Sequence, residues 1–311
     1  MYRKDQIALT PPLGWNSWDC YGPAVNEEQL LGNAQYMADH LKAHGWEYVV
    51  CDIQWYEPEA GKHHWEYNRF AQLCLDENGR AVPDPVRFPS AANGAGFKPI
   101  ADKIHAMGLK FGIHIMRGVP RLAVHNRMTV KGTEISCHEI AHRNSICAWN
   151  TDMYGIDADK PGAQAYYDSI FELYAGWGVD YVKVDDICNV KATPLEEYSA
   201  RREIEMIRTA IDRCGRGMVL SLSPGPAVIN EAWHMAKHAN MWRITDDFWD
   251  NWPSLLEMFW RCEVWQAHVQ PGQYPDCDML PLGRIAITAD GKGHYTNFTK
   301  PEQITLMSLW G

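Results

Sequence analysis

The chain has 311 residues, a net charge of −10 and 46% hydrophobic residues, which is enough apolar material for one large core. Its basic residues are scattered, which argues against nucleic acid as a partner. Residues 1–12 lack the apolar region of a signal peptide, and no later run is long enough to span a bilayer, so we expect a cytoplasmic protein without a membrane partner. Nine cysteines without regular spacing argue against a disulfide framework.

Apolar strands and amphipathic helices are predicted to alternate along the first half of the chain. A proline-bounded stretch at residues 10–18 precedes a helix that Asn26 caps and Gly45 ends. The segments 54–95 and 116–160 are predicted to be long loops, and the second is too long for a passive connection. Around these loops the pattern predicts helices at 97–107 and 161–176, and strands at 48–53, 110–115 and from 181 onward.

The second half of the chain continues this alternation. Thr193-Pro194-Leu195-Glu196 has the spacing of a capping box with proline at the first helical position, so a helix is predicted from there to about residue 214. A second capping box at 299–302 begins a helix that reaches the end of the sequence. Between them the pattern predicts strands at 218–221 and 241–243 and a helix at 252–266.

Strand–helix alternation predicts parallel βα units and an α/β fold. Polar groups gather after seven strand candidates, namely Trp18, Asp52, His114, Asp185, Ser223, Asp247 and Asp278. That pattern is typical of a (β/α)₈ TIM barrel, whose active site lies at the carboxyl ends of the strands. A doubly wound open sheet is the second choice, because no glycine-rich phosphate loop follows the first strand.

The stretch Tyr181-Val182-Lys183-Val184-Asp185-Asp186 is the most informative in the sequence. Strand alternation places Lys183 and Asp185 on one face and the two valines on the other. A face with these two charges cannot be buried in hydrocarbon at tolerable cost, so the pair either forms a structural ion pair or lines a site.

A second strand end carries Asp246 and Asp247. Carboxylates from two strands of one barrel face can approach to about 5 Å, the separation in retaining glycosidases. One of them must then stay ionised as the nucleophile, and a neighbour such as Lys183 would lower its pKa. The other must hold a proton. Acids at a barrel mouth also bind metals, so the spacing alone leaves that alternative open.

Two other patterns compete with this interpretation. His138-Glu139-Ile140-Ala141-His142 matches the HExxH zinc motif, although it lacks a long amphipathic helix and a third ligand at the usual spacing. We therefore predict no zinc bound by these two histidines. Near strand ends there are also three cysteines, Cys20, Cys51 and Cys188, which are predicted to be small core residues rather than nucleophiles.

Several motifs resemble glycoside hydrolase family 27, the α-galactosidase and α-N-acetylgalactosaminidase group. The resemblance runs from Thr10 to Gly311 and rests on TPPLGWNSW at 10–18, LDENGRAVPDPVRFPS at 75–90, YVKVDD at 181–186, WRITDDFWDNW at 242–252 and DCDML at 276–280. It implies that Asp185 is the nucleophile and Asp247 the acid/base. The sugar-binding residues that it implies are Trp18, Asp52, Lys183, Arg243 and Asp278, and the same subsite would include His114 and Ser223.

The chain departs from the family pattern at three places. Ile53 follows Asp52 where the family commonly has a second acid, so another contact to the outer hydroxyls of the sugar is missing or comes from Gln54 or Glu57. His114 stands where a tyrosine is expected. Ser223 and Ala227 resemble the N-acetylgalactosaminidase pattern at the segment that recognises the substituent at C2.

The resemblance implies a retaining, exo-acting glycosidase that cleaves terminal α-D-galactose from a small-molecule carbohydrate and needs no metal or organic cofactor. The alternatives are α-N-acetylgalactosaminidase, β-L-arabinopyranosidase and a carbohydrate-binding barrel without turnover. Residues 1–311 are expected to form a catalytic domain cut before its eighth strand and before a β-sandwich domain. Unpaired edges are then expected at the strand near Leu13 and at the strand before Asp278. The oligomeric state is open.

Overall fold

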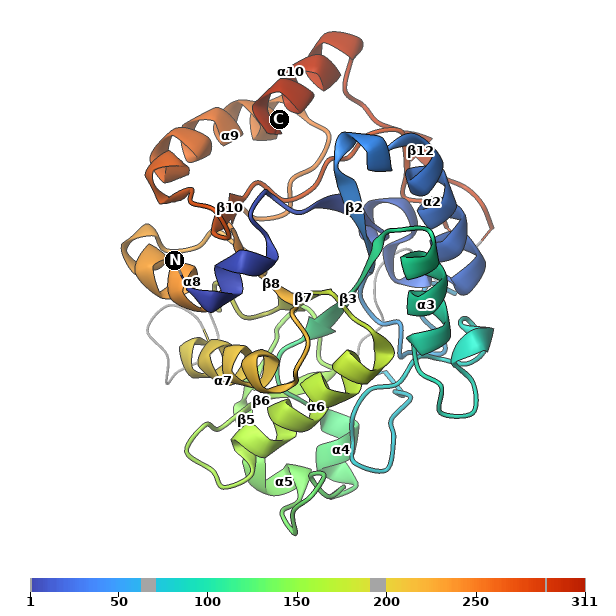
Figure 1. Ribbon diagram of the computed structural model, residues 1–311, viewed down its shortest axis with the longest axis vertical. Helices are drawn as coiled ribbons and strands as arrows, with labels where there is room; N and C mark the ends of the chain where they lie inside the picture. The colour runs from blue at the N-terminus through green and yellow to red at the C-terminus, as the bar shows by residue number, and fades with distance from the viewer. Residues whose placement is uncertain (1, 63–70, 191–199, 289, 311) are drawn as a thin grey trace.

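The computed structural model describes residues 2–62, 71–190, 200–288 and 290–310. At its centre lies a sheet of parallel strands in the order β1-β2-β3-β7-β8-β9-β10 (Figure 1). Helices surround this sheet, which confirms the predicted (β/α) barrel architecture with seven strands among the described residues. The strands are β1 (Leu13–Asn16), β2 (Trp46–Cys51), β3 (Lys110–Met116), β7 (Tyr181–Asp185), β8 (Val219–Leu222), β9 (Met241–Arg243) and β10 (Tyr274–Asp276).

Most of the surrounding helices follow the sequence prediction, but helix α8 (Ala232–His238) was not predicted. Asn26 caps the first long helix and accepts a hydrogen bond from the Gln29 backbone N–H at 2.9 Å. Thr299 begins the last helix through its 2.7 Å hydrogen bond to Glu302, whereas the capping box expected at 193–196 lies outside the described residues. The helices are α2 (Glu27–His40), α3 (Lys98–Ala106), α6 (Ala163–Trp177), α7 (Arg201–Arg213), α8 (Ala232–His238), α9 (Trp252–Trp265) and α10 (Lys300–Trp310).

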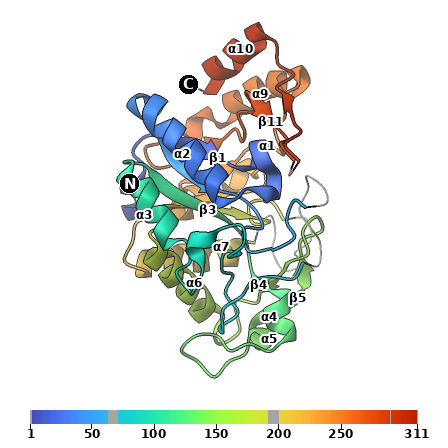
Figure 2. The ribbon, with the colours of Figure 1, turned by 90° about the vertical axis from the view of Figure 1, so that its right-hand side faces the viewer.

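The segment 116–160, predicted to be a loop, instead contains several short strands and helices. It forms a three-stranded antiparallel sheet in the order β4-β6-β5, which lies with α4 and α5 at one end of the molecule (Figure 2). The polar strand β5 lacks alternation and its pairing with β6 shifts register, so periodicity could not reveal it. The elements are β4 (Val119–Pro120), α4 (Arg121–His125), α5 (Cys137–Ile140), β5 (Ala141–Ile146) and β6 (Met153–Ile156).

The HExxH match does not form the geometry of a zinc peptidase. Helix α5 ends at Ile140, so His142 belongs to strand β5 rather than to the helix that carries His138. The ring of His138 contacts the Arg143 guanidinium instead. The prediction that no helix presents both histidines on one face is therefore confirmed.

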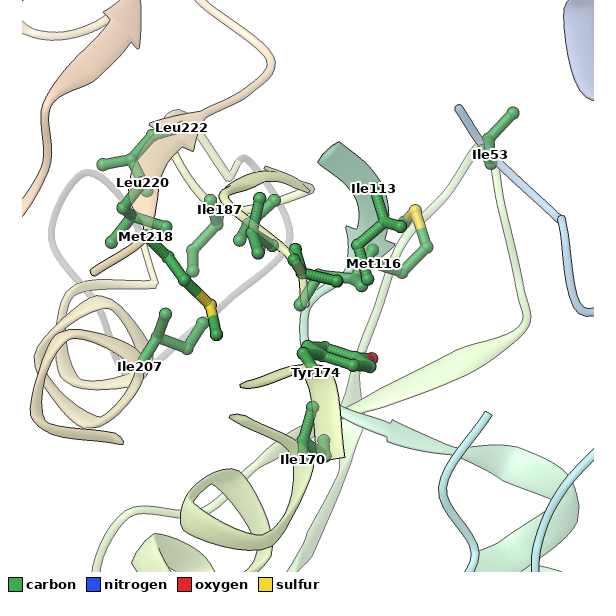
Figure 3. Packing of buried hydrophobic residues seen from close by; sticks show 14 of the residues in the cluster. Ile53, Ile113, Met116, Ile170, Tyr174, Ile187, Ile207, Met218, Leu220 and Leu222 are labelled. Atoms are coloured by element: carbon green, nitrogen blue, oxygen red, sulfur yellow. The ribbon is translucent and has the colours of Figure 1, made fainter. Parts of the chain in front are cut away.

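The core lies between the sheet and the helices α6 and α7. Figure 3 shows Leu220 and Leu222 of β8 with Ile207 of α7 on one side, and Ile113 of β3 near Ile170 and Tyr174 of α6 on the other. Cys51 and Cys188 are also buried in this core, and burial raises the pKa of both thiols. Thiols that are hard to ionise are poor nucleophiles, which supports their prediction as core residues.

Strands β1 and β10 lie at the two ends of the sheet. The N-terminal turn η1 (Arg3–Ile7) packs at the start of β10, where the Tyr274 hydroxyl donates to the Ala8 carbonyl at 3.1 Å. Gly272 allows this approach, because a Cβ there would lie 2.4 Å from Asp5. Among the described residues β1 pairs only with β2 and β10 only with β9, as expected for open edges at the strand near Leu13 and at the strand before Asp278. None of the described helices is long and apolar enough to cross a membrane.

Candidate active site

Strand β7 presents two charged side chains to the space at the carboxyl end of the sheet. Val182 and Val184 are fully buried on the opposite face, as alternation predicts. The Lys183 ammonium lies 3.9 Å from the Asp185 carboxylate and 3.1 Å from that of Asp52. The lysine therefore forms ion pairs with two carboxylates, one from its own strand and one that follows strand β2.

Asp52 is held in place by residues of the first strand and the turn after it. The Asn16 amide donates to Asp52 Oδ2 at 2.7 Å, and the Asp52 backbone N–H donates to the Ser17 hydroxyl at 2.9 Å. Burial alone would raise the pKa of Asp52, but the charges of Lys183 and His114 outweigh burial and lower it. A fixed, ionised acceptor results, which suits a sugar hydroxyl.

His114 of strand β3 contacts Asp185 directly. Its Nε2 lies 2.9 Å from Asp185 Oδ2, and the ring is fully buried. Burial alone would raise the pKa of Asp185, yet Lys183 and the hydrogen bond from His114 bring it well below its usual range. Asp185 is consequently ionised over the whole physiological pH range.

The next acid, Asp186, points into a different environment. Its φ of 55° places it in the left-handed region, and its carboxylate forms a 2.9 Å ion pair with Arg117. Arg117 is buried and also binds Glu203 at 2.8 Å, while its Nε–H donates to the Asp186 carbonyl. Burial raises the pKa of Asp186 to about 6. Asp186 and Arg117 thus fix the end of the strand behind Asp185.

Arg243 of strand β9 contacts three polar side chains on the other side of the site. One of its terminal nitrogens donates to Ser223 Oγ at 3.2 Å and to Asp247 Oδ1 at 3.0 Å, and the other lies 3.1 Å from Asp278. The Asp247 side chain is 54% exposed, whereas Asp278 is 7% exposed. Asp247 is therefore the acid at the open mouth of the site.

Three acids near this end of the sheet, Asp19, Asp276 and Asp278, hold protons more tightly than usual. Burial raises the pKa of Asp278 to about 7, against the opposing charge of Arg243. Burial likewise raises the pKa of Asp276, whose side chain accepts from the Asp278 backbone N–H at 2.9 Å. Burial, and then the negative charge of Asp278, raise the pKa of Asp19 well above its usual value.

Most of the predicted site residues are brought together by the fold. Contacts link Asp52, Lys183, His114 and Asp185 on one side, and Ser223, Arg243, Asp247 and Asp278 on the other. The backbone N–H of Trp18 donates to Asn16 Oδ1 at 2.8 Å, while a contact of its ring with sugar stays a prediction. Asn16, Ser17, Asp19 and Arg117 were not predicted; the only sequence signal for the first three was the polar-aromatic stretch that contains them.

The two residues expected to replace a second acid after Asp52 contact other parts of the chain. The Gln54 amide donates to Asp152 Oδ2 at 2.8 Å, and Glu57 Oε1 accepts from the Glu59 backbone N–H. Ile53 itself is 2% exposed and belongs to the apolar core, while its backbone N–H donates to Asp52 Oδ1 at 2.8 Å. A buried apolar side chain thus stands at the position where a second acid was expected.

The charge balance of the site favours a neutral, hydroxyl-rich ligand. Lys183 and Arg243 offset the ionised carboxylates of Asp52 and Asp185, and these four groups, like Asp247, can bind a hydroxyl. A separate cavity of about 490 Å³ lies by the antiparallel sheet and is lined by other residues, including Arg121, Arg143 and Asp152. We place the chemistry at the strand ends, because the coupled acids are there.

Known proteins are similar to this chain in sequence and in structure. Residues 155–300 match the family described as alpha galactosidase A. Alpha-galactosidase 3 of Arabidopsis thaliana is 28% identical over 302 residues, which are 95% of this chain and 55% of the relative. The chain therefore spans little more than half the length of that curated relative.

Two solved structures are much more similar. A family GH27 β-L-arabinopyranosidase from Geobacillus stearothermophilus, crystallised with arabinose, shares 56% identity over 99% of this chain and 71% of its own, with a TM-score of 0.95. A putative α-N-acetylgalactosaminidase from Bacillus halodurans shares 59% identity over 97% of this chain and 68% of its own, with a TM-score of 0.83.

Proposed function

Because this chain belongs to glycoside hydrolase family 27, we propose that it cleaves a terminal pyranose from a glycoside with retention of configuration. One observation carries the proposal: Asp185 is kept ionised by Lys183 and His114, while Asp247 lies at the open mouth of the same site. An ionised acid inside and a second acid facing solvent are the two groups that a double displacement requires.

In the first step, Asp185 attacks the anomeric carbon. Its Oδ2 is the oxygen held by His114 and Lys183, so we assign the attack to Oδ1. The new bond joins Oδ1 to the anomeric carbon as the glycosidic C–O bond breaks, and Asp247 transfers its proton to the departing oxygen. In the second step Asp247 takes a proton from water, whose oxygen displaces Asp185 and leaves the sugar free.

We further propose β-L-arabinopyranose as the preferred terminal sugar. It has the ring stereochemistry of α-D-galactose without the hydroxymethyl group at C5. Buried Ile53 offers no acceptor for such a hydroxyl, whereas Asp52 remains available for the ring hydroxyls. The 56% identity to a β-L-arabinopyranosidase supports the same choice.

Two other terminal sugars from the same family remain candidates. α-D-Galactose differs only by the extra hydroxymethyl group. α-N-Acetylgalactosamine is favoured by the small side chains of Ser223 and Ala227 at the C2 position, and by the 59% identity to a putative α-N-acetylgalactosaminidase. Ser223 Oγ already accepts a hydrogen bond from Arg243, however, and a hydroxyl at C2 can join this pair without an acetamido group.

The test compares nitrophenyl β-L-arabinopyranoside, α-D-galactoside and α-N-acetylgalactosaminide as substrates. We expect the highest kcat/KM with the first, and proton NMR should show that the sugar is released with its anomeric configuration retained. Asp185→Asn should abolish turnover, and azide should restore it as a glycosyl azide of inverted configuration. Asp247→Asn with azide should give the retained azide. Sugar binding without any turnover would instead support the non-catalytic alternative.

A further inference from the structure

Outside the active site, three metal-binding side chains meet between two neighbouring helices. Glu205 lies on α7, and His234 and His238 lie one turn apart on the adjacent helix α8, as the two helices lie side by side (Figure 1). One ligand atom from each residue falls within 4.8 Å of the other two. His234 is fully buried, and its Nε2 lies 3.2 Å from the Glu205 carboxylate.

We propose that Glu205, His234 and His238 form a binding site for a divalent transition metal, with zinc as the best fit. Two imidazoles and one carboxylate are a common zinc donor set, and the fourth position stays open to water. Histidines four residues apart on a helix project from the same face, so both rings can turn toward one ion. Their ring centroids already lie 4.6 Å apart.

The competing interactions around the cluster are weak. Arg201 lies 3.6 Å from Glu205, and both side chains are more than a third exposed, so solvent screens this ion pair. The Arg201 guanidinium also stacks over Trp233, at 5.2 Å from the ring centroid, and this stacking can persist when the carboxylate turns to a metal. A divalent ion therefore displaces this exposed salt bridge and the 3.2 Å contact between His234 and Glu205, and gains three ligands.

A metal here would join α8 to α7. Helix α8 has only seven residues and begins without a side-chain cap, so its stability depends on packing against its neighbours. The site lies in the outer layer of helices and shares no residue with the catalytic groups. We therefore expect the metal to stabilise the fold rather than to take part in glycoside cleavage.

The experiment titrates Co²⁺, as a spectroscopic substitute for Zn²⁺, into protein stripped with EDTA. The wild type should bind one equivalent with the visible bands of a four- or five-coordinate site. His238→Gln and Glu205→Gln, both at partly exposed positions, should each weaken binding by roughly tenfold or more. His44→Gln is the matched control at an exposed histidine outside the cluster and should bind as the wild type does.

Thermal unfolding gives a second readout that does not depend on catalysis. A saturating amount of Zn²⁺ should raise the Tm of the wild type and of His44→Gln by several degrees, and should leave His238→Gln unchanged. Unchanged Co²⁺ affinity in both cluster variants would overturn the proposal. A near-ultraviolet charge-transfer band from thiolate to cobalt would also overturn it, because the ion would then be bound by cysteine.

Discussion

His114 Nε2 and Asp185 Oδ2 lie 2.9 Å apart, so a histidine directly contacts the carboxylate to which we assign nucleophilic attack. Strands β3 and β7 pair in parallel with His114 opposite Lys183, which places the two side chains that lower the pKa of Asp185 at the same level of the sheet. The low pKa of Asp185 is thus produced by two neighbouring side chains that can be changed separately.

Replacing His114 by phenylalanine should raise the pKa of Asp185, because one hydrogen bond and one source of positive charge are lost. Asp185 must be ionised to attack, so the acid limb of the kcat/KM profile should move to higher pH while activity near neutral pH falls less. His114→Tyr restores a hydrogen-bond donor. The acid limb of its kcat/KM profile should therefore stay near the pH at which it lies in the wild type. An acid limb that does not move in the phenylalanine variant would contradict this role.

Ile53→Asp tests the preference for a sugar without a hydroxymethyl group. A carboxylate here supplies an acceptor for the extra hydroxyl of galactose, and a hydrogen bond to a charged group is worth about 1.5–3 kcal/mol. The ratio of α-galactoside to β-L-arabinopyranoside kcat/KM should therefore rise by roughly tenfold or more. Ile53→Val serves as the control and should leave the ratio unchanged. A lower Tm is expected for the aspartate variant, because Ile53 is buried.

Asp152 should make the folded state less stable as the pH rises. Burial raises its pKa to about 6, while the unfolded chain releases this proton near pH 3.9. The folded state therefore binds the extra proton between these values, and its contribution to stability is lost as the pH rises through 6. Between pH 4 and pH 7, the free energy of unfolding of Asp152→Asn should rise relative to that of the wild type by up to about 3 kcal/mol. Urea unfolding across this pH range measures the difference. If the free energy of unfolding changed with pH in the same way for both proteins, Asp152 would not be the cause of the pH dependence.

Removing Arg117 should destabilise the protein far more than removing an exposed arginine. Arg117→Met leaves the buried carboxylates of Asp186 and Glu203 without their shared partner, at a cost of about 3–5 kcal/mol. Arg213→Met breaks an exposed pair with Asp168 and should cost less than about 1 kcal/mol. Adding Glu203→Gln to Arg117→Met should recover part of the loss, since one uncompensated charge is removed. Equal Tm values for the two arginine variants would contradict this account.

The sequence predicted the parts of the site that local pattern can encode. Alternation alone placed Lys183 and Asp185 on one face of a strand, and the structure confirms that the intervening valines are buried. The parallel βα order also placed the acids of β7 and β9 at one end of the sheet. The identities of the nucleophile and the acid/base came from the resemblance and stay predictions.

Other parts of the structure depend on contacts that no local pattern reveals. Asn16 holds Asp52 across 36 residues, and Arg117 reaches Glu203 across 86. Helix α8 was missed because it has seven residues and no side-chain cap, and β5 because its residues are mainly polar. Such elements form through tertiary packing, which overrides a weak local preference.

The alternation along β7 has a consequence for which insertions and deletions the protein can survive. A shift of one residue between Tyr181 and Asp185 would turn Lys183 and Asp185 into the apolar core and expose the valines. It would remove the ion pair to Asp52 and the contact with His114 at the same moment. We expect length changes among functional variants to be confined to segments outside the central sheet, while the five residues of this strand change only by substitution.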